Sequence, residues 1–322
     1  MDICSKKYYE LKQELDQCDY FECENYQNML LNIKAALKSS GIIALTGIVG
    51  IGKTVTLRKI QQAVKEENKI LVSKSLADKR QVNINTLYTA LFADLATRKD
   101  GNLPTQAEKR ERKLQMLVKE INKPIALFID EAHDLHPRTL VSLKHIIETV
   151  QDVNGTLSIL VVGHPKLAND LRNPALEEIG ARAKLFELQS LGTNSVKFIE
   201  WLLGKALNDG IKPKDIIAQE AIEFFAERLI TPLQINQYIT RALEKGYHIG
   251  EKPVSLETAK STLSPDLNGL EANLARNGYN QVVLCDRLNI RRHEMKAYFR
   301  GQLSPSRFEE INKEIHKLGV VI

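Results

Sequence analysis

The chain of 322 residues lacks any run of about 18 apolar residues, the length that a membrane-spanning helix requires. Its N-terminal stretch is polar, without the apolar segment of a secretory signal. Both absences argue against a membrane-embedded or exported protein. We therefore expect no membrane partner and a cytoplasmic location.

Cysteine is scarce, and the four that occur have no zinc-type spacing: Cys4, Cys18, Cys23 and Cys285. Free thiols in a reducing cytoplasm are the simplest account of them. Internal repeats and low-complexity tracts are also missing. The sequence contains no N-K-x-D motif of the guanine-specific type, which favours ATP over GTP as a ligand.

The composition is that of an ordinary soluble protein, with 43% hydrophobic and 26% charged residues. The length allows two or three compact units. A net charge of +5 permits binding to nucleic acid without requiring it.

The most informative segment fits the phosphate-binding pattern G-x-x-x-x-G-K-[ST] at every position. It consists of Gly47, Ile48, Val49, Gly50, Ile51, Gly52, Lys53 and Thr54. An apolar run at 41–46 precedes it and a helix-compatible stretch at 55–60 follows, which is the context that the motif needs. Lys53 is expected to reach the β- and γ-phosphates of ATP, and the Thr54 hydroxyl to hold Mg²⁺. The alternative is a chance glycine-rich turn.

A second acidic motif follows the apolar run 125–129. Asp130 is expected at the carboxyl end of a buried strand, where it holds Mg²⁺ through the water shell of the ion. Glu131 suits a general base that activates the attacking water, which favours hydrolysis over transfer to a second substrate. The alternative is a helix cap formed by two acids. The letters from Asp130 to His133 also spell a helicase box, but no other helicase motif accompanies them.

Five apolar runs alternate with helical patterns, at 41–46, 69–73, 125–129, 157–163 and 184–188. This alternation predicts a doubly wound parallel sheet of five strands in an α/β P-loop NTPase fold. We expect four parts: an N-terminal helical segment (1–40), the nucleotide-binding α/β domain (41–192), a helical lid domain (193–250) and a C-terminal helical unit (251–322).

Several stretches resemble the ExeA/GspA-like AAA+ ATPases. They are the run 160–167 with Leu171 and Arg182, the lid motif 231–239, and the tail 274–322. The last two look like the members that accompany transposases, such as TnsC and TniB. The resemblance covers roughly residues 20–322. It implies the additional-strand type of P-loop sheet, in which another strand lies between the phosphate-loop strand and the Asp130 strand.

The resemblance also implies roles for single residues. His164 takes the sensor-1 place, where a polar side chain touches the γ-phosphate or the attacking water. Arg182 takes the place of an arginine finger for the ATP of a neighbouring subunit, with Arg172 in reserve. The alternative for His164 is a histidine that only ends a strand, and the alternative for Arg182 is a surface charge. Leu233 and Gln234 stand where secretion-type members have the sensor-2 arginine, so we expect the lid to contact ATP less directly than in those members.

Residues 281–300 show the helix-turn-helix pattern, with Asn289 at the turn where a positive φ is wanted. The second helix would expose a basic face for DNA phosphates, represented by Arg291, Arg292 and Lys296. Alternatives are a plain three-helix packing unit and a docking site for a transposase. Lys79 and Arg80, which follow the second strand, are further candidates for DNA contact.

Together these features predict an ATP-hydrolysing regulator of DNA transposition that forms a ring or helical filament on double-stranded DNA and recruits a transposase. The alternatives are a secretion-accessory ATPase of the ExeA type, a replication-initiator or helicase-loader ATPase, and a nucleotide switch with slow turnover. An adjacent integrase-fold transposase gene would favour the first, and a secretion operon the second.

Overall fold

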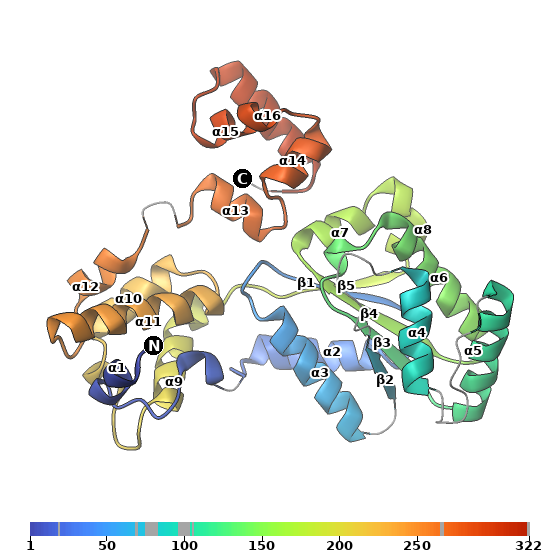
Figure 1. Ribbon diagram of the computed structural model, residues 1–322, viewed down its shortest axis with the longest axis horizontal. Coiled ribbons are helices and arrows are strands. Elements are labelled where there is room, and N and C mark those ends of the chain that lie inside the picture. Colours follow the sequence, from blue (N-terminus) through green and yellow to red (C-terminus); the bar gives the residue numbers. More distant parts are fainter. Residues whose placement is uncertain are drawn as a thin grey trace. The chain divides into compact units, whose positions relative to one another are not determined.

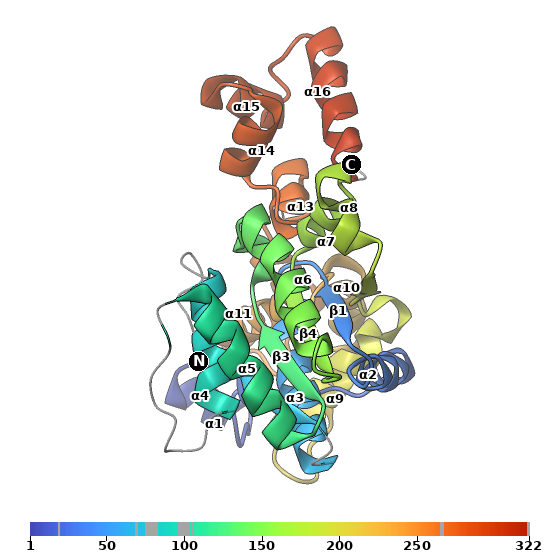
Figure 2. The same ribbon diagram turned by 90° about the vertical axis from the view of Figure 1, so that its right-hand side faces the viewer.

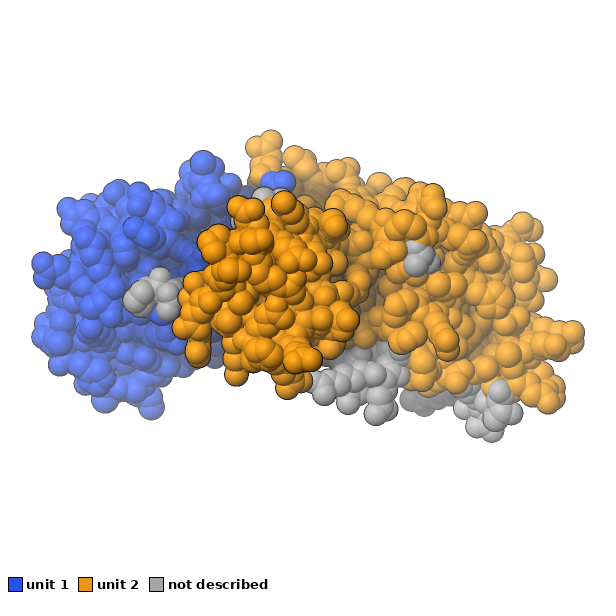
Figure 3. Space-filling model, turned by 90° about the horizontal axis from the view of Figure 1, so that it is seen from above, with its two compact units in different colours: residues 1–23, 49–52, 189–272 blue, residues 24–48, 53–188, 273–322 orange. Residues whose placement is uncertain are grey.

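The computed structural model describes residues 1–18, 20–67, 70–74, 83–95, 104, 106–264 and 267–320. The chain forms two compact units, coloured separately in Figure 3. Unit 1 comprises residues 1–23, 49–52 and 189–272, and unit 2 comprises 24–48, 53–188 and 273–322. These units cut across the four segments expected from sequence, whose independence as domains stays a prediction.

Unit 2 is built on a parallel sheet of five strands, which confirms the predicted fold class (Figure 1). In spatial order the strands are β2 (Leu71–Lys74), β3 (Ile125–Ile129), β4 (Leu157–Gly163), β1 (Gly41–Thr46) and β5 (Ala183–Glu187). Strand β4 pairs with both β1 and β3, so it lies between the phosphate-loop strand and the Asp130 strand, as expected.

Both faces of this sheet are covered by helices. Strands β3 and β4 are buried at every position, which explains their continuous apolar runs. Alternate strand residues on one face form an apolar core with helices α4 (Ile84–Leu95), α5 (Ala107–Ile121), α6 (Pro137–Gln151), α7 (Pro165–Leu171) and α8 (Glu177–Gly180). Helices α2 (Glu24–Ala36) and α3 (Lys53–Glu67) pack on the other face. Short 3₁₀ turns η2 (Ala132–Asp134) and η3 (Pro174–Leu176) connect these elements.

Unit 1 is helical. It contains α1 (Ile3–Tyr8), α9 (Ser195–Ala206), α10 (Gln219–Arg228), α11 (Pro232–Ile249) and α12 (Leu256–Thr262), with 3₁₀ turns at Leu15–Gln17, Gly192–Asn194 and Pro213–Asp215. The N-terminal segment is part of this core, because Tyr9 is fully buried and its hydroxyl donates to the Glu251 carbonyl at 2.9 Å. A bridge between Leu11 and Leu207 continues the contact.

The C-terminal helices are α13 (Leu270–Arg276), α14 (Gln281–Leu288), α15 (Arg292–Phe299) and α16 (Pro305–Lys317). Asn289 ends α14 with φ +52°, which confirms the predicted positive φ at the turn. From residue 189 onward the described chain contains helices and no strand. Among the described residues, none of the helices combines the length and the apolarity needed to traverse a lipid bilayer.

Candidate nucleotide site

The phosphate-binding segment connects β1 to the first turn of α3, at the carboxyl edge of the sheet. Gly50 and Gly52 adopt φ values of +81° and +103°, conformations that side-chain-bearing residues avoid. A β-carbon added at Gly52 would meet nothing within 4 Å, so open space lies beside the backbone there. Residues in such a turn point their backbone N–H groups toward an anion.

Lys53 begins α3 and is 7% exposed. Its ammonium donates to the carbonyls of Gly47 and Ile48 at 2.9 and 3.1 Å, which bends the side chain back over the loop. Desolvation lowers the pKa of Lys53, while the carboxylates of Glu131 and Asp130 act in the opposite direction. Both carboxylates therefore favour the charged form that a phosphate group would bind.

The Thr54 hydroxyl donates to the Asp130 carboxylate at 3.0 Å, although the two residues come from different strand–helix connections. These are the two oxygen ligands that the sequence assigns to Mg²⁺, and the structure brings them together. Glu131 follows in a left-handed conformation with φ +54°, and its N–H donates to the other oxygen of Asp130 at 2.8 Å. A non-glycine residue in this region is rare outside functional sites and tight turns.

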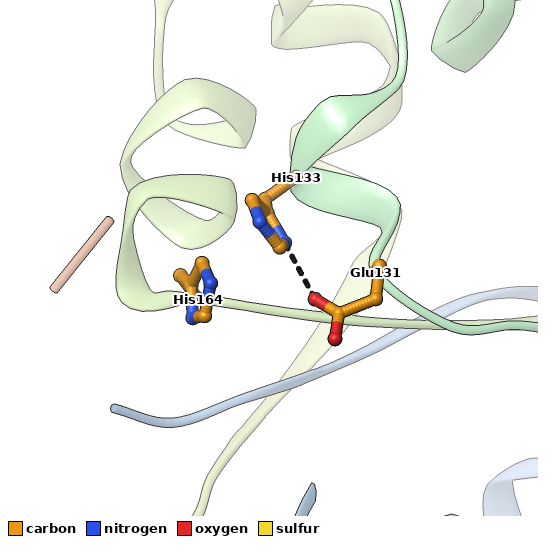
Figure 4. Close-up of side chains that lie close together, drawn as sticks. All are labelled: Glu131, His133 and His164. Atoms are coloured by element: carbon orange, nitrogen blue, oxygen red, sulfur yellow. Dashed lines mark ion pairs between the residues drawn. The ribbon is translucent and has the colours of Figure 1, made fainter. Parts of the chain in front are cut away.

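Two histidines lie close to Glu131 (Figure 4). His133 lies on η2, and its Nδ1 is 3.4 Å from Oε2 of Glu131. His164 follows β4, and its Nδ1 is 3.3 Å from Nζ of Lys53. The two rings touch, with centroids 3.8 Å apart. Desolvation lowers the pKa of His133, and desolvation, His133 and Lys53 together lower that of His164 to about 4. Both rings are therefore neutral at pH 7.

The lid motif reaches the phosphate loop within unit 1. The N–H of Leu233 donates to the Gly50 carbonyl at 3.2 Å. A β-carbon at Gly50 would lie 2.8 Å from that of Leu233, so glycine is required for this approach as well as for the turn. Gln234 instead forms a capping box with Thr231 at the start of α11. Leu233 thus contributes a backbone contact, and Gln234 stabilises the helix terminus.

The two candidate arginine fingers are exposed. Arg182, between α8 and β5, has a side chain that is 70% exposed and lies 3.7 Å from Glu148. Arg172 ends α7 and is exposed too. An arginine that serves the ATP of a neighbouring subunit is expected to be accessible in this way.

The predicted helix-turn-helix packs as expected from the sequence: Leu284, Ile290, Met295 and Tyr298 are buried. Five basic residues on and beside α15 are at least partly exposed: Arg291, Arg292, His293, Lys296 and Arg300. The other two candidates for DNA contact, Lys79 and Arg80, lie outside the described residues.

Two features of this region do not follow from the sequence. In the sequence, His133 appears only as the last letter of the helicase-like string Asp130–His133. The turn 277–279 before α14 packs on the first turn of α7, where Lys166 donates its N–H to the Asn277 carbonyl at 3.2 Å. A β-carbon on Gly278 would lie 3.0 Å from that of His164. Figure 2 shows the end of α16 next to α7 and α8, and a β-carbon on Gly319 would lie 2.9 Å from Oδ1 of Asn169.

The residues present fit a nucleoside triphosphate with Mg²⁺. The open glycine turn, the buried ammonium and the Thr54–Asp130 pair together supply N–H donors, a cation and hard oxygen ligands. The fold class that the sheet and the phosphate loop define is that of the AAA P-loop NTPases.

Comparison with known proteins agrees with this class. Residues 36–171 match the family described as AAA domain. General secretion pathway protein A of Aeromonas hydrophila is 27% identical over 165 residues, which are 49% of this chain and 29% of that protein. The chain thus spans less than a third of the curated relative. The predicted resemblance to ExeA/GspA-like AAA ATPases is supported.

Solved structures extend the likeness to nearly the whole chain. The ORC2 protein of Aeropyrum pernix, in ADPNP–ADP complexes, matches with a TM-score of 0.58 and 12% identity over 98% of this chain and 90% of its own. Drosophila ORC bound to DNA matches with a TM-score of 0.52 and 14% identity over 97% and 82%. At such identities the likeness defines the fold and nothing finer.

Proposed function

We propose that this protein is an ATP-hydrolysing AAA+ regulator of DNA transposition, which assembles on double-stranded DNA in the presence of ATP and recruits or activates a transposase. The observation that carries the ATPase part is the convergence of Lys53, Thr54, Asp130 and Glu131 at one edge of the sheet. The transposition part rests on the resemblance of residues 231–239 and 274–322 to transposon-associated ATPases.

In this scheme the loop N–H groups and Lys53 hold the phosphates of ATP, and Glu131 orients the attacking water and accepts its proton. Thr54 and Asp130 would hold Mg²⁺, which would neutralise part of the phosphate charge. His164, close to Lys53, is placed to touch the γ-phosphate or the water. Arg182 acts on the ATP of the next subunit, so that ATP binding favours assembly.

A replication initiator is the second candidate. Its support is the fold shared along almost the whole chain with ORC proteins, one of which was solved bound to DNA. The two candidates differ in how they choose DNA. A coating regulator binds any duplex of sufficient length, whereas an initiator prefers its own sites.

The first test measures assembly on DNA. With a non-hydrolysable ATP analogue and Mg²⁺, we expect filaments or rings on plasmid DNA in electron micrographs, and equal binding to unrelated duplexes of the same length. With ADP the assemblies are expected to be sparse. Binding confined to one sequence would favour the initiator, and binding that ignores the nucleotide would contradict the scheme.

DNA affinity measured over a range of salt concentrations tests the helix-turn-helix. Replacing Arg292 and Lys296 with Ala should weaken binding similarly on all sequences. The slope of log affinity against log salt concentration should become shallower by about 1 for each DNA phosphate that the variant no longer neutralises. The control removes the same charge from exposed positions of unit 2, with Lys65→Ala and Lys119→Ala. Equal salt slopes for the two double variants would remove α15 from the DNA interface.

The role of Arg182 in a neighbouring site predicts complementation. Arg182→Ala should lower ATP hydrolysis by about 1,000-fold or more, as loss of an arginine finger does elsewhere. Mixed in equal amounts with inactive Glu131→Gln, it should recover up to roughly a quarter of the wild-type rate, because one subunit lends its arginine to the intact acid of the other. Arg172→Ala is the matched comparison. If Arg172→Ala is inactive and recovers activity when mixed with Glu131→Gln, whereas Arg182→Ala does not, Arg172 is the arginine finger.

A further inference from the structure

Glu131, His133 and His164 form a cluster that the nucleotide chemistry uses only in part. A carboxylate oxygen and two imidazole nitrogens of these residues lie within 4.8 Å of one another. Figure 4 shows the two rings and the carboxylate facing one another. We propose that the cluster is a binding site for one transition-metal ion of the Zn²⁺ class, and that the bound ion withdraws Glu131 from catalysis.

The local backbone builds this cluster. The left-handed conformation of Glu131 begins η2, which carries His133 back toward the end of β4. Gly163 leaves room for that turn, because a β-carbon there would lie 3.1 Å from the His133 nitrogen and 3.3 Å from its β-carbon. His164 comes next in the chain, so the close approach at Gly163 brings the two rings together.

Both imidazoles offer a nitrogen to a metal. Nδ1 of His133 is buried and has no hydrogen-bond partner, and its approach to Glu131 at 3.4 Å is an ion-pair distance only. Nδ1 of His164 lies 3.3 Å from Nζ of Lys53, so Nε2 is the nitrogen of this ring that is left for a metal. A neutral imidazole with its proton on one nitrogen keeps a lone pair on the other.

The ligand chemistry selects the metal. Two imidazoles and one carboxylate with a water in the fourth position suit Zn²⁺, whereas Mg²⁺ prefers oxygen ligands such as Thr54 and Asp130. Zn–N bonds of about 2.0–2.1 Å place tetrahedral ligand atoms roughly 3.3 Å apart. The His133–Glu131 separation of 3.4 Å already meets this value. The ligand atoms of all three residues lie within 4.8 Å of one another, so metal binding requires the His164 nitrogen to move closer to the other two.

The surrounding charge does not prevent binding. The ammonium of Lys53 lies near His164 and opposes a second cation, but the carboxylates of Glu131 and Asp130 offset it. An ion bound here is coordinated by Glu131, the proposed general base, and by His164, whose ring is proposed to touch the γ-phosphate or the attacking water. The inhibitory consequence rests on the proposed ATPase function, whereas the binding itself does not.

The test uses Co²⁺, whose spectrum reports its ligands, with the full-length protein free of nucleotide. Wild type should bind one equivalent with visible bands of a nitrogen–oxygen site and no thiolate charge-transfer band, which excludes the four cysteines. Glu131→Gln, His133→Ala and His164→Ala should each lower the affinity at least about tenfold. His145→Ala removes an exposed histidine that also pairs with a glutamate, Glu111, and should bind as wild type does.

Identical Co²⁺ spectra and affinities for wild type and all three cluster variants would overturn the proposal. Glu131→Gln is nearly isosteric and carries the test if the histidine variants fail to fold. In a second arm, micromolar Zn²⁺ should suppress ATP hydrolysis at millimolar Mg²⁺. If the metal binds but no ATPase activity exists, the proposed function fails alone; if activity exists but no metal binds, this inference fails alone.

Discussion

Replacing Glu131 with Gln should reduce ATP hydrolysis by about 100- to 10,000-fold while ATP binding stays near the wild-type level. The amide keeps the size of the side chain but cannot accept a proton from water. The main-chain geometry should survive, because it depends on the Glu131 N–H bond to Asp130 and not on the carboxylate. Phosphate release and retention of labelled ATP measure the two quantities separately.

Assembly on DNA gives this variant a second readout. If hydrolysis releases the subunits, Glu131→Gln should accumulate long-lived assemblies with ATP, as wild type does with a non-hydrolysable analogue. Glu120→Gln, an exposed acid on α5, is the control and should behave as wild type. An unchanged rate of phosphate release in Glu131→Gln would identify the protein as a slow nucleotide switch with no general base at this position.

The site residues that sequence predicts well are those whose geometry is set locally. The loop from Gly47 to Thr54 needs only a strand, a glycine turn and a helix, and each element can be recognised from its own residues. Asp130 belongs to another connection, yet parallel strands end at one edge of a sheet, so its meeting with Thr54 also follows from the fold class. The structure adds the 3.0 Å bond between them.

His133 cannot be placed in the same way. Its position depends on the positive φ of Glu131, a conformation that no propensity assigns to a glutamate. It depends further on the small size of Gly163, a residue thirty positions away. A histidine in the sequence is compatible with many rotamers and neighbours, and only the folded backbone selects the contact with Glu131 and His164.

Contacts between residues that are distant in the sequence are equally hard to predict from the sequence. The approach of Leu233 to Gly50 joins residues of the lid motif and of the phosphate loop, and explains why position 50 tolerates no side chain. The packing of Gly278 on His164 joins the C-terminal helices to the residue that follows β4. The roles of Arg182, Arg291, Arg292 and Lys296 stay predictions, because each requires a second molecule.

Replacing Lys53 with Ala should raise the Kd for ATP by roughly 100-fold, and ATP-dependent assembly on DNA should disappear with the loss of binding. The ammonium is buried and is held by two carbonyls within hydrogen-bond distance, so it stands ready beside the loop before any ligand arrives. Its charge-assisted hydrogen bonds to phosphate oxygens are worth about 3 kcal/mol, which corresponds to roughly 100-fold in Kd. Alanine supplies neither the charge nor the donors.

Filter retention of radiolabelled ATP measures this loss, with and without Mg²⁺. Lys65→Ala removes an exposed charge from the same helix and should retain ATP as wild type does. Removing a buried ammonium whose pKa is lowered by desolvation should not unfold the chain, and circular dichroism checks that. A Lys53→Ala protein that still holds ATP at wild-type affinity would place the triphosphate elsewhere. One that loses ATP yet coats DNA as wild type does would separate DNA binding from the nucleotide.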